Sequence, residues 1–396
     1  MTRKILAAGW WRAGRRIKHR LQSAGVCIVL MGAALSAAAE PLLDCPLRDA
    51  PFSVDMALID ALLSPAASAA INEQMPDLFA GLPAIMKKTE TPSFAAIMSV
   101  RGLANMKRQP EENILALDKK LRQLTVTDKD RRARCARYDN DVPALATDSA
   151  TVNILVFNKI NGFDHGPSVG AATAALQAIA KAKGWSVAVT DKGGAFNTET
   201  LDRFDVVVWN NISGDALTLS QRAAFKQYIE QGGGFLGIHG SGGDPIYFWN
   251  WYADTLLGAR FIGHPMEPQF QDAGIAVENT ASGIGASLKP GWSMKDEWYS
   301  FAKSPRGKAV TVVAILDEST YSPKGMFGQD LHMGEDHPIA WSRCVKNGRA
   351  FYTAIGHRPE VYSVKENITL LTDALAWAAG QGKTQCRNGK EVAVAH

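Results

Sequence analysis

The spacing of hydrophobic residues changes near residue 150 of this 396-residue chain. Before it, apolar residues recur every three or four positions, as on one face of an amphipathic helix. The stretch 110–124 is the clearest case, because Pro110 and two glutamates open it and Ile114, Leu117 and Leu121 share a face. The pattern therefore predicts a small helical module over residues 40–138, which packs on a neighbour or binds a partner.

After residue 150 the apolar residues form short continuous runs, which is typical of strands that are covered on both faces. These runs alternate with helical patterns at 171–183 and 220–231. Strands that alternate with helices predict an α/β domain with a mostly parallel sheet. A polar stretch at 139–150 reads as a linker. The predicted strands are 152–157, 186–189, 204–209 and 235–238, with a later one at 349–356.

The charge of the chain depends on its first 39 residues. The whole chain carries a formal charge of +4, but seven basic and no acidic residues lie between Arg3 and Arg20. The rest has 36 basic against 39 acidic side chains, so nothing indicates a nucleic-acid partner. The composition is otherwise that of a globular protein, with 46% hydrophobic residues.

The same 39 residues have the pattern of a secretory signal peptide. A basic start is followed by the apolar run 24–35 and by small residues at Ala37 and Ala39. The alternative, a membrane anchor, needs about 20 apolar residues, and this run is shorter. The pattern predicts a periplasmic or secreted protein with no stable membrane span after cleavage.

Four cysteines follow the signal segment. An even number in an oxidising compartment favours disulfides. The simplest pairing is local to each predicted module, Cys45 with Cys135 and Cys344 with Cys386, and the alternative is four free thiols. No Cys-x-x-Cys motif supports a zinc ribbon.

Three histidines follow predicted strands. His165 comes after the first strand, His239 directly after the fourth, and His357 after the late strand. Because the carboxyl ends of parallel strands meet at one edge of a sheet, these side chains are expected to share a site. Glycines flank all three, which allows tight turns and close approach of a ligand.

Other residues are weaker candidates. Asp296 and Glu297 supply carboxylates that orient a histidine or act as a base. Residues expected to contact a substrate are His264, His337, Tyr299, Tyr352, Asp244 and Trp249. Trp249 belongs to the aromatic run 247–252, which is either a platform for sugar rings or ordinary core packing.

Residues 151–381 resemble the ThuA-like, or trehalose utilisation, family. The matching stretches are NILVFNKINGFDH, DVVVWNN, GGGFLGIHGSGGD, DEWYSF, HPIAW and NGRAFYTAIGHRPEVY, in that order. The family is similar in fold to class I glutamine amidotransferases, so the resemblance implies a flavodoxin-like three-layer α/β/α sandwich. Residues 382–396 would be a C-terminal tail. One departure is Asp164, where the family usually has an arginine.

The resemblance also bears on chemistry. An amidotransferase has a cysteine in its Gly-x-Cys-x-Gly turn, whereas this chain has His239 there, which excludes glutamine hydrolysis by a thiolate. The family association implies an exported protein of disaccharide, glycoside or keto-sugar metabolism. Its acid–base groups would be His165, His239, His357 and a carboxylate from Glu297 or Asp296.

Two points stay open at this stage. A divalent metal bound by several of the histidines is a variant of the enzyme hypothesis, although no closely spaced histidine pair supports it. The alternative function is a periplasmic module that binds sugars or a partner through a degenerate pocket. The sequence leaves the substrate, the reaction and the oligomeric state undetermined.

Overall fold

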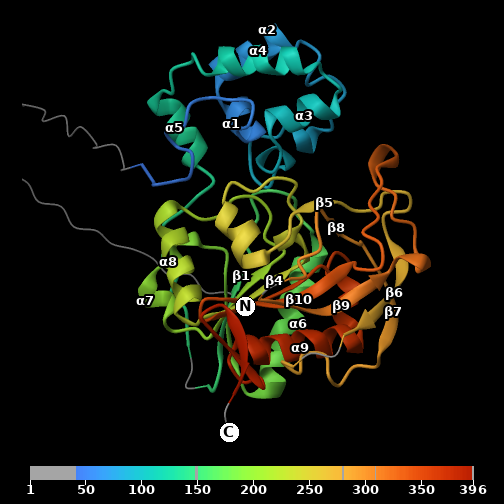
Figure 1. The fold of residues 1–396 in the computed structure, drawn as a ribbon. Helices are drawn as coiled ribbons and strands as arrows, with labels where there is room; N and C mark the ends of the chain where they lie inside the picture. Colours follow the sequence, from blue (N-terminus) through green and yellow to red (C-terminus); the bar gives the residue numbers. More distant parts are fainter. Residues whose placement is uncertain (1–41, 148–149, 279–280, 308, 395–396) are drawn as a thin grey trace, which may run out of the picture. The chain divides into compact units, whose positions relative to one another are not determined.

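The computed structural model describes residues 42–147, 150–278, 281–307 and 309–394. The expected signal segment lies outside these residues. The first part of the described chain is helical (Figure 1). Its helices are α1 (Leu58–Leu63), α2 (Pro65–Gln74), α3 (Val100–Met106), α4 (Glu111–Leu121) and α5 (Asp128–Cys135), with short 3-10 turns η1 (Ala84–Met86) and η2 (Phe94–Ala96).

Local sequence sets the helix boundaries in this module. The Ser64 and Ser99 hydroxyls accept hydrogen bonds from the first turns of α2 and α3. Thr127 and Asp130 form a reciprocal capping box at the start of α5, as their spacing indicates. Ile114, Leu117 and Leu121 of α4 are fully buried, so the predicted apolar face is the face that packs.

A nine-stranded sheet forms the centre of the following α/β domain, with strand order β2-β1-β3-β4-β11-β10-β9-β6-β7. The strands β2, β1, β3, β4 and β11 pair in parallel, and the last four pair antiparallel. Their bounds are β1 (Asn153–Phe157), β2 (Ser186–Thr190), β3 (Val206–Asn210), β4 (Gly234–Ile238), β6 (Gln271–Val277), β7 (Gly291–Asp296), β9 (Val310–Asp317), β10 (Pro338–Val345) and β11 (Gly348–Thr353).

Strand direction decides which residues share an edge. Four antiparallel steps separate β11 from β7, so these two strands run the same way. The carboxyl ends of β1, β4, β11 and β7 therefore lie at one edge of the sheet. A separate two-stranded sheet pairs β5 (Phe261–Gly263) with β8 (Ser300–Phe301).

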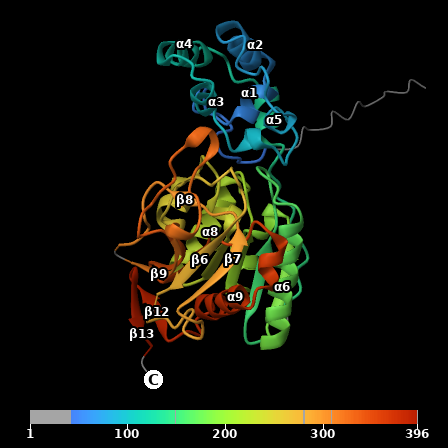
Figure 2. The same cartoon turned by 90° about the vertical axis from the view of Figure 1, so that its right-hand side faces the viewer.

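Helices cover both faces of the sheet, as expected for a three-layer sandwich (Figures 1 and 2). Neighbouring residues on a strand point to opposite faces. On β3, Trp209 stacks on Phe225, while the Asn210 amide donates to the Val169 carbonyl. Phe225 belongs to α8 (Leu219–Gln231), which covers one face beside α7 (Thr198–Leu201) and the π-helix η5 (Trp251–Leu257). Val169 belongs to α6 (Pro167–Lys183), which covers the other face beside α9 (Lys365–Ala378).

Both expected disulfides are present. Cys45–Cys135 ties the start of the described chain to the end of α5, and Cys344–Cys386 ties the chain end to β10. The segment expected to be a C-terminal tail folds over most of its length as a hairpin of β12 (Thr384–Arg387) and β13 (Lys390–Ala393). The apolar runs seen in the sequence do not include this short hairpin, whose buried Cys386 is bonded to Cys344.

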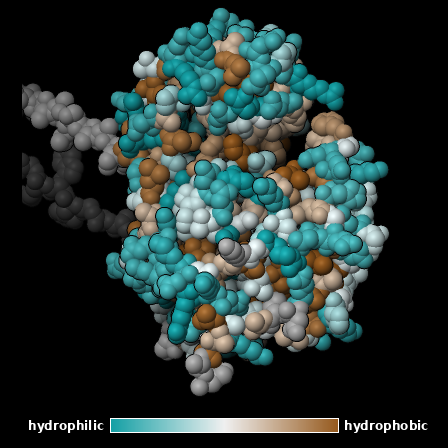
Figure 3. Space-filling model, viewed as in Figure 1, coloured by the Kyte–Doolittle hydropathy of each residue, from teal (hydrophilic) through white to brown (hydrophobic). Residues whose placement is uncertain are grey.

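The helical module and the α/β domain contact each other directly, and residues from Leu42 onward form one compact unit. The Ser93 backbone N–H donates to the Asn161 carbonyl at 3.0 Å, and the Tyr138 hydroxyl donates to Asp215 at 2.9 Å. The face seen in Figure 3 is mostly hydrophilic, with small separate groups of hydrophobic residues. Among the described residues, no helix is both long and apolar enough to cross a bilayer.

Candidate active site

Three imidazoles meet at the carboxyl edge of the sheet. His239 follows β4 directly, His357 lies four residues after β11, and His165 lies in the loop after β1. The ring centroid of His165 lies 4.9 Å from that of His239 and 4.9 Å from that of His357, and the centroids of His239 and His357 are 5.3 Å apart. The parallel strand directions thus bring together side chains that are far apart in sequence.

His239 occupies a sharp turn, η4 (His239–Gly242), and its backbone φ angle is +38°. Side chains other than glycine rarely adopt positive φ, and such residues often mark functional sites. Its Nδ1–H donates to the Ala354 carbonyl at 2.6 Å, and its Nε2 faces Nδ1 of His357 at 3.3 Å. The Tyr299 ring stacks on the imidazole with centroids 4.1 Å apart.

The glycines beside His239 allow side chains to press against the turn. A Cβ atom on Gly240 would lie 2.5 Å from Cε1 of His165, and a Cβ atom on Gly243 would lie 2.5 Å from the Tyr299 hydroxyl. Both distances are shorter than any real contact of a methyl group. The run Gly-Ser-Gly-Gly therefore serves close packing around the imidazoles.

Glu297 provides the carboxylate of the cluster. Its Oε2 lies 3.0 Å from Nδ1 of His357 and 3.5 Å from Nε2 of His239, and its Oε1 lies 3.2 Å from Nδ1 of His264. Gln269 also donates a short hydrogen bond to Oε1. Burial alone would raise the pKa of Glu297, but the hydrogen bonds from His239 and His357 outweigh it and hold that pKa well below its usual range.

The pKa values of two further groups are shifted. Burial, with help from the neighbouring imidazoles, lowers the pKa of His165 well below its ordinary value, so this ring is neutral near pH 7. Burial raises the pKa of Tyr299 well above its usual range, so its hydroxyl stays protonated. That hydroxyl lies 3.5 Å from Nε2 of His165.

A cavity of about 440 Å³ opens onto this cluster. Of the expected residues, it is lined by His165, His357, Glu297, His264, Tyr299 and Asp244. Its volume lies within the usual range for small-molecule sites. Most of the lining is apolar, including Phe261 and Met326.

Part of this wall comes from the helical module. Phe94 and Ile97 line the cavity, and the Phe94 ring packs edge-on against Phe163 with centroids 6.4 Å apart. The sequence analysis assigned no chemistry to these residues, nor to Gln269 or Ser213, which also line the cavity. Only their proximity to the sheet edge identifies them, because their types and spacing are those of ordinary core and loop residues.

Asp296 lies beneath the cluster and outside the cavity lining. It is fully buried, and its two carboxylate oxygens accept hydrogen bonds from the backbone N–H groups of Gly356 and Arg358, at 2.7 and 3.0 Å. These are the residues on either side of His357. Asp296 thus positions the loop that carries this imidazole.

His337 and Tyr352 are also buried behind the cavity. His337 contacts the Glu318 carboxylate at 2.7 Å and the Tyr299 carbonyl at 2.8 Å. The Tyr352 hydroxyl donates to the His239 carbonyl at 2.9 Å. Both side chains therefore support residues of the cluster from outside the cavity. The exposed Asp164 accepts a hydrogen bond from the Gly166 N–H at 2.8 Å.

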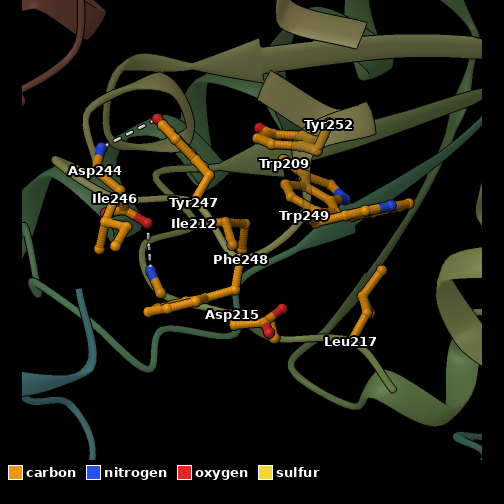
Figure 4. A pocket seen from close by; sticks show the side chains of 12 residues that line it. Trp209, Ile212, Asp215, Leu217, Asp244, Ile246, Tyr247, Phe248, Trp249 and Tyr252 are labelled. Carbon is orange, nitrogen blue, oxygen red and sulfur yellow. Dashed lines mark hydrogen bonds between the residues drawn. The ribbon is translucent and has the colours of Figure 1, made fainter. Parts of the chain in front are cut away.

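Trp249 lies apart from the histidines. Together with Trp209 and Tyr252 it lines a pocket of about 30 Å³, which is too small for a sugar ring (Figure 4). Trp209 and Tyr252 stack with centroids 4.5 Å apart, and the Trp249 and Tyr252 rings are nearly parallel. The aromatic run packs here in the way that core aromatics do.

Comparison with known proteins identifies the domain. The family model described as "Trehalose utilisation" (ThuA) matches residues 153–378, which is more than half of the chain. The chain belongs to the ThuA family. The helical module lies outside this match, and a search of curated proteins found no match.

One solved structure supports the fold of the ThuA domain. A ThuA-like protein from Bacteroides uniformis matches with 24% identity and a TM-score of 0.52, covering 61% of this chain and 97% of its own. A ThuA-like protein from Parabacteroides merdae matches with 14% identity and a TM-score of 0.45, covering 62% and 97%. The flavodoxin-like α/β fold expected from the sequence is confirmed, as is the family.

Proposed function

We propose that this ThuA-family protein is an exported enzyme that acts on a carbohydrate, a disaccharide, glycoside or keto-sugar, by proton transfer in the histidine-lined cavity. The observation that carries the proposal is the cluster of His165, His239, His357 and Glu297, of which all but the buried His239 line a cavity of about 440 Å³. The family name supports a role in carbohydrate utilisation.

The charges in the cluster suit acid–base chemistry. A neutral, buried His165 can accept a proton from a carbon or hydroxyl next to a ketone. The ionised Glu297 then stabilises the imidazolium that forms, and the Tyr299 hydroxyl donates to an oxygen of the substrate. In an isomerisation the proton returns to the neighbouring carbon, and in an elimination it goes to the leaving oxygen.

Two observations support export. Both disulfides are of the kind that persists in oxidising compartments. The first 39 residues have the composition of a secretory signal. We therefore place the working protein in the periplasm or outside the cell.

Turnover of a panel of disaccharides and their 3-keto forms tests the proposal. We expect His165→Ala to lower the rate about 10²–10⁴-fold, which is the usual contribution of a general base. His332→Ala is the matched control, because His332 is exposed and bonds Glu318 away from the cavity. Equal rates in both variants contradict the proposal. A sugar that raises the melting temperature without turnover supports the alternative, a binding module.

A further inference from the structure

The histidine cluster has the geometry of a metal-binding site. One ring nitrogen from each of His165, His239 and His357 lies within 4.8 Å of the others. Imidazole nitrogens with free lone pairs repel one another when they converge, unless a proton or a cation lies between them. The carboxylate of Glu297 adds a negative charge at the same point.

The shortest distances fit one shared ion. Nε2 of His239 and Nδ1 of His357 are 3.3 Å apart, and Oε2 of Glu297 lies 3.5 and 3.0 Å from them. In a tetrahedral site with metal–ligand distances of about 2.0–2.1 Å, neighbouring ligand atoms are about 3.3–3.4 Å apart. These three atoms therefore form one face of such a coordination shell with almost no movement.

Neighbouring groups orient the ligands as they do in metalloproteins. The His239 Nδ1–H donates to the Ala354 carbonyl at 2.6 Å, which fixes the tautomer whose Nε2 faces the other ligands. Metal-binding histidines almost always have such a partner on the second nitrogen. The backbone bonds of Asp296 fix the loop of His357, and Gln269 and His264 hold the other oxygen of Glu297.

His165 can complete the set. It is 8% exposed, and its Nδ1 has no hydrogen-bond partner within the described part of the chain. This nitrogen is therefore available as a ligand beside those of His239 and His357. An unpartnered buried nitrogen in a polar cluster is the kind of group that an ion would satisfy.

We infer that His165, His239, His357 and Glu297 bind one divalent transition-metal ion. Three imidazoles and one carboxylate favour Zn²⁺, Mn²⁺, Fe²⁺ or Co²⁺ over Mg²⁺ and Ca²⁺, which prefer oxygen ligands. The inference rests on the site of the proposed function and deepens it. A bound ion would polarise a carbonyl or hydroxyl of the carbohydrate, and the proton-transfer role that His165 has in the metal-free site would pass to His264 and Tyr299, which line the cavity.

Metal binding can be measured without any substrate. Untagged protein is stripped with a chelator and dialysed, and Co²⁺ and Zn²⁺ are titrated by visible absorption and calorimetry. We expect one equivalent to bind, with the d–d absorption of four- or five-coordinate Co²⁺. Glu297→Gln and His239→Asn should each weaken metal binding by more than about 100-fold. Loss of a contact that only supports a ligand weakens it by at most about that factor. Asparagine is chosen because it tolerates the positive φ of His239.

His332→Ala is the control, since it removes an imidazole from a different histidine–carboxylate group. Circular dichroism of each variant separates lost binding from lost folding. The inference is overturned if the folded wild type binds neither Co²⁺ nor Zn²⁺. It is also overturned if the folded variants His239→Asn and Glu297→Gln bind these ions as tightly as the wild type does. Turnover that survives chelation would overturn the metal alone, whereas metal binding without turnover of any sugar would overturn the proposed function alone.

Discussion

The carboxylate of Asp296 holds the backbone on both sides of His357. It accepts hydrogen bonds from the N–H groups of Gly356 and Arg358 and contacts no part of the cavity. A buried side chain that fixes a loop in this way acts through the residue that the loop carries.

Replacing Asp296 should therefore damage the site more than the fold. In Asp296→Asn one of the two acceptors becomes an NH₂ group that faces a backbone N–H, so the loop of His357 shifts. We expect an about 10–100-fold loss of affinity for Co²⁺, the usual effect of a lost supporting contact. For a sugar that the wild type converts, kcat should fall by a larger factor than KM rises. Asp254→Asn, on an exposed pair with Arg260, is the control, and an equal effect there would refute the positioning role.

Gly240→Ala should displace His165. The new methyl group would lie 2.5 Å from Cε1 of that ring, so the imidazole has to move or the turn has to open. We expect about 1–3 kcal/mol of destabilisation, as for other overpacked sites, together with loss of activity. Denaturant unfolding of the variant measures the first effect.

The matching control is Gly170→Ala in the interior of α6, where the new methyl group would have nothing within 4 Å apart from its chain neighbours and the backbone of its own helix. That change should leave stability unchanged or raise it by about 1 kcal/mol, because alanine favours helix more than glycine does. If Gly240→Ala and Gly170→Ala lowered the free energy of unfolding equally, contact with His165 would not be the cause.

Asp244 should make stability depend on pH. Burial raises its pKa from 3.8 to about 7, against the opposing hydrogen bonds from Ser213 and the Gly214 N–H. The folded protein thus keeps a proton that the unfolded chain releases above about pH 4. The contribution of this group to the free energy of unfolding is complete below that pH and is lost as pH rises to about 7, by up to about 4 kcal/mol.

Asp244→Asn should remove this dependence, because the amide stays neutral and can still contact Ser213 and Gly214. The difference in unfolding free energy between wild type and variant, measured in urea from pH 4.5 to 8, should shift in favour of the variant as pH rises. Exposed Asp272→Asn should follow the wild type. Parallel curves for wild type and Asp244→Asn would contradict the prediction.

Phe94→Ala tests whether the helical module contributes to ligand binding. This ring lines the cavity and packs on Phe163, which in turn packs on His165 with centroids 4.9 Å apart. We expect KM for a sugar that the wild type converts to rise about tenfold. The effect on kcat should be smaller, because Phe94 packs on Phe163 and not on the histidines. Ile85→Ala, at an exposed position of the same module, should change neither. An unchanged KM in Phe94→Ala would exclude the module from the site.

Strand ends made the three histidines predictable. A parallel sheet has one carboxyl edge, so His165, His239 and His357 could be grouped from the order of apolar runs. Glu297 could be named from its position but not placed. The strand before it, β7, belongs to the antiparallel extension, whose direction depends on pairing partners far away in sequence.

Other parts of the site could not be predicted for a different reason. Asp296 and Glu297 are adjacent acids, yet one binds backbone beneath the loop and the other faces the imidazoles. Alternation along an extended segment separates them, and only the fold shows which one points to the cavity. Phe94 carries no chemical signal at all, and its role comes from contacts between two modules.

Phe94 and Ile97, which line part of the cavity, lie outside the residues 153–378 that match the family model. Membership of the family is therefore a poor guide to which ligand the cavity accepts. Two relatives with the same imidazoles but different leading segments would enclose differently shaped spaces. A shortened protein that began at the first strand would expose Phe163 to water. Preparations intended for ligand screening should therefore keep everything from Leu42 onward.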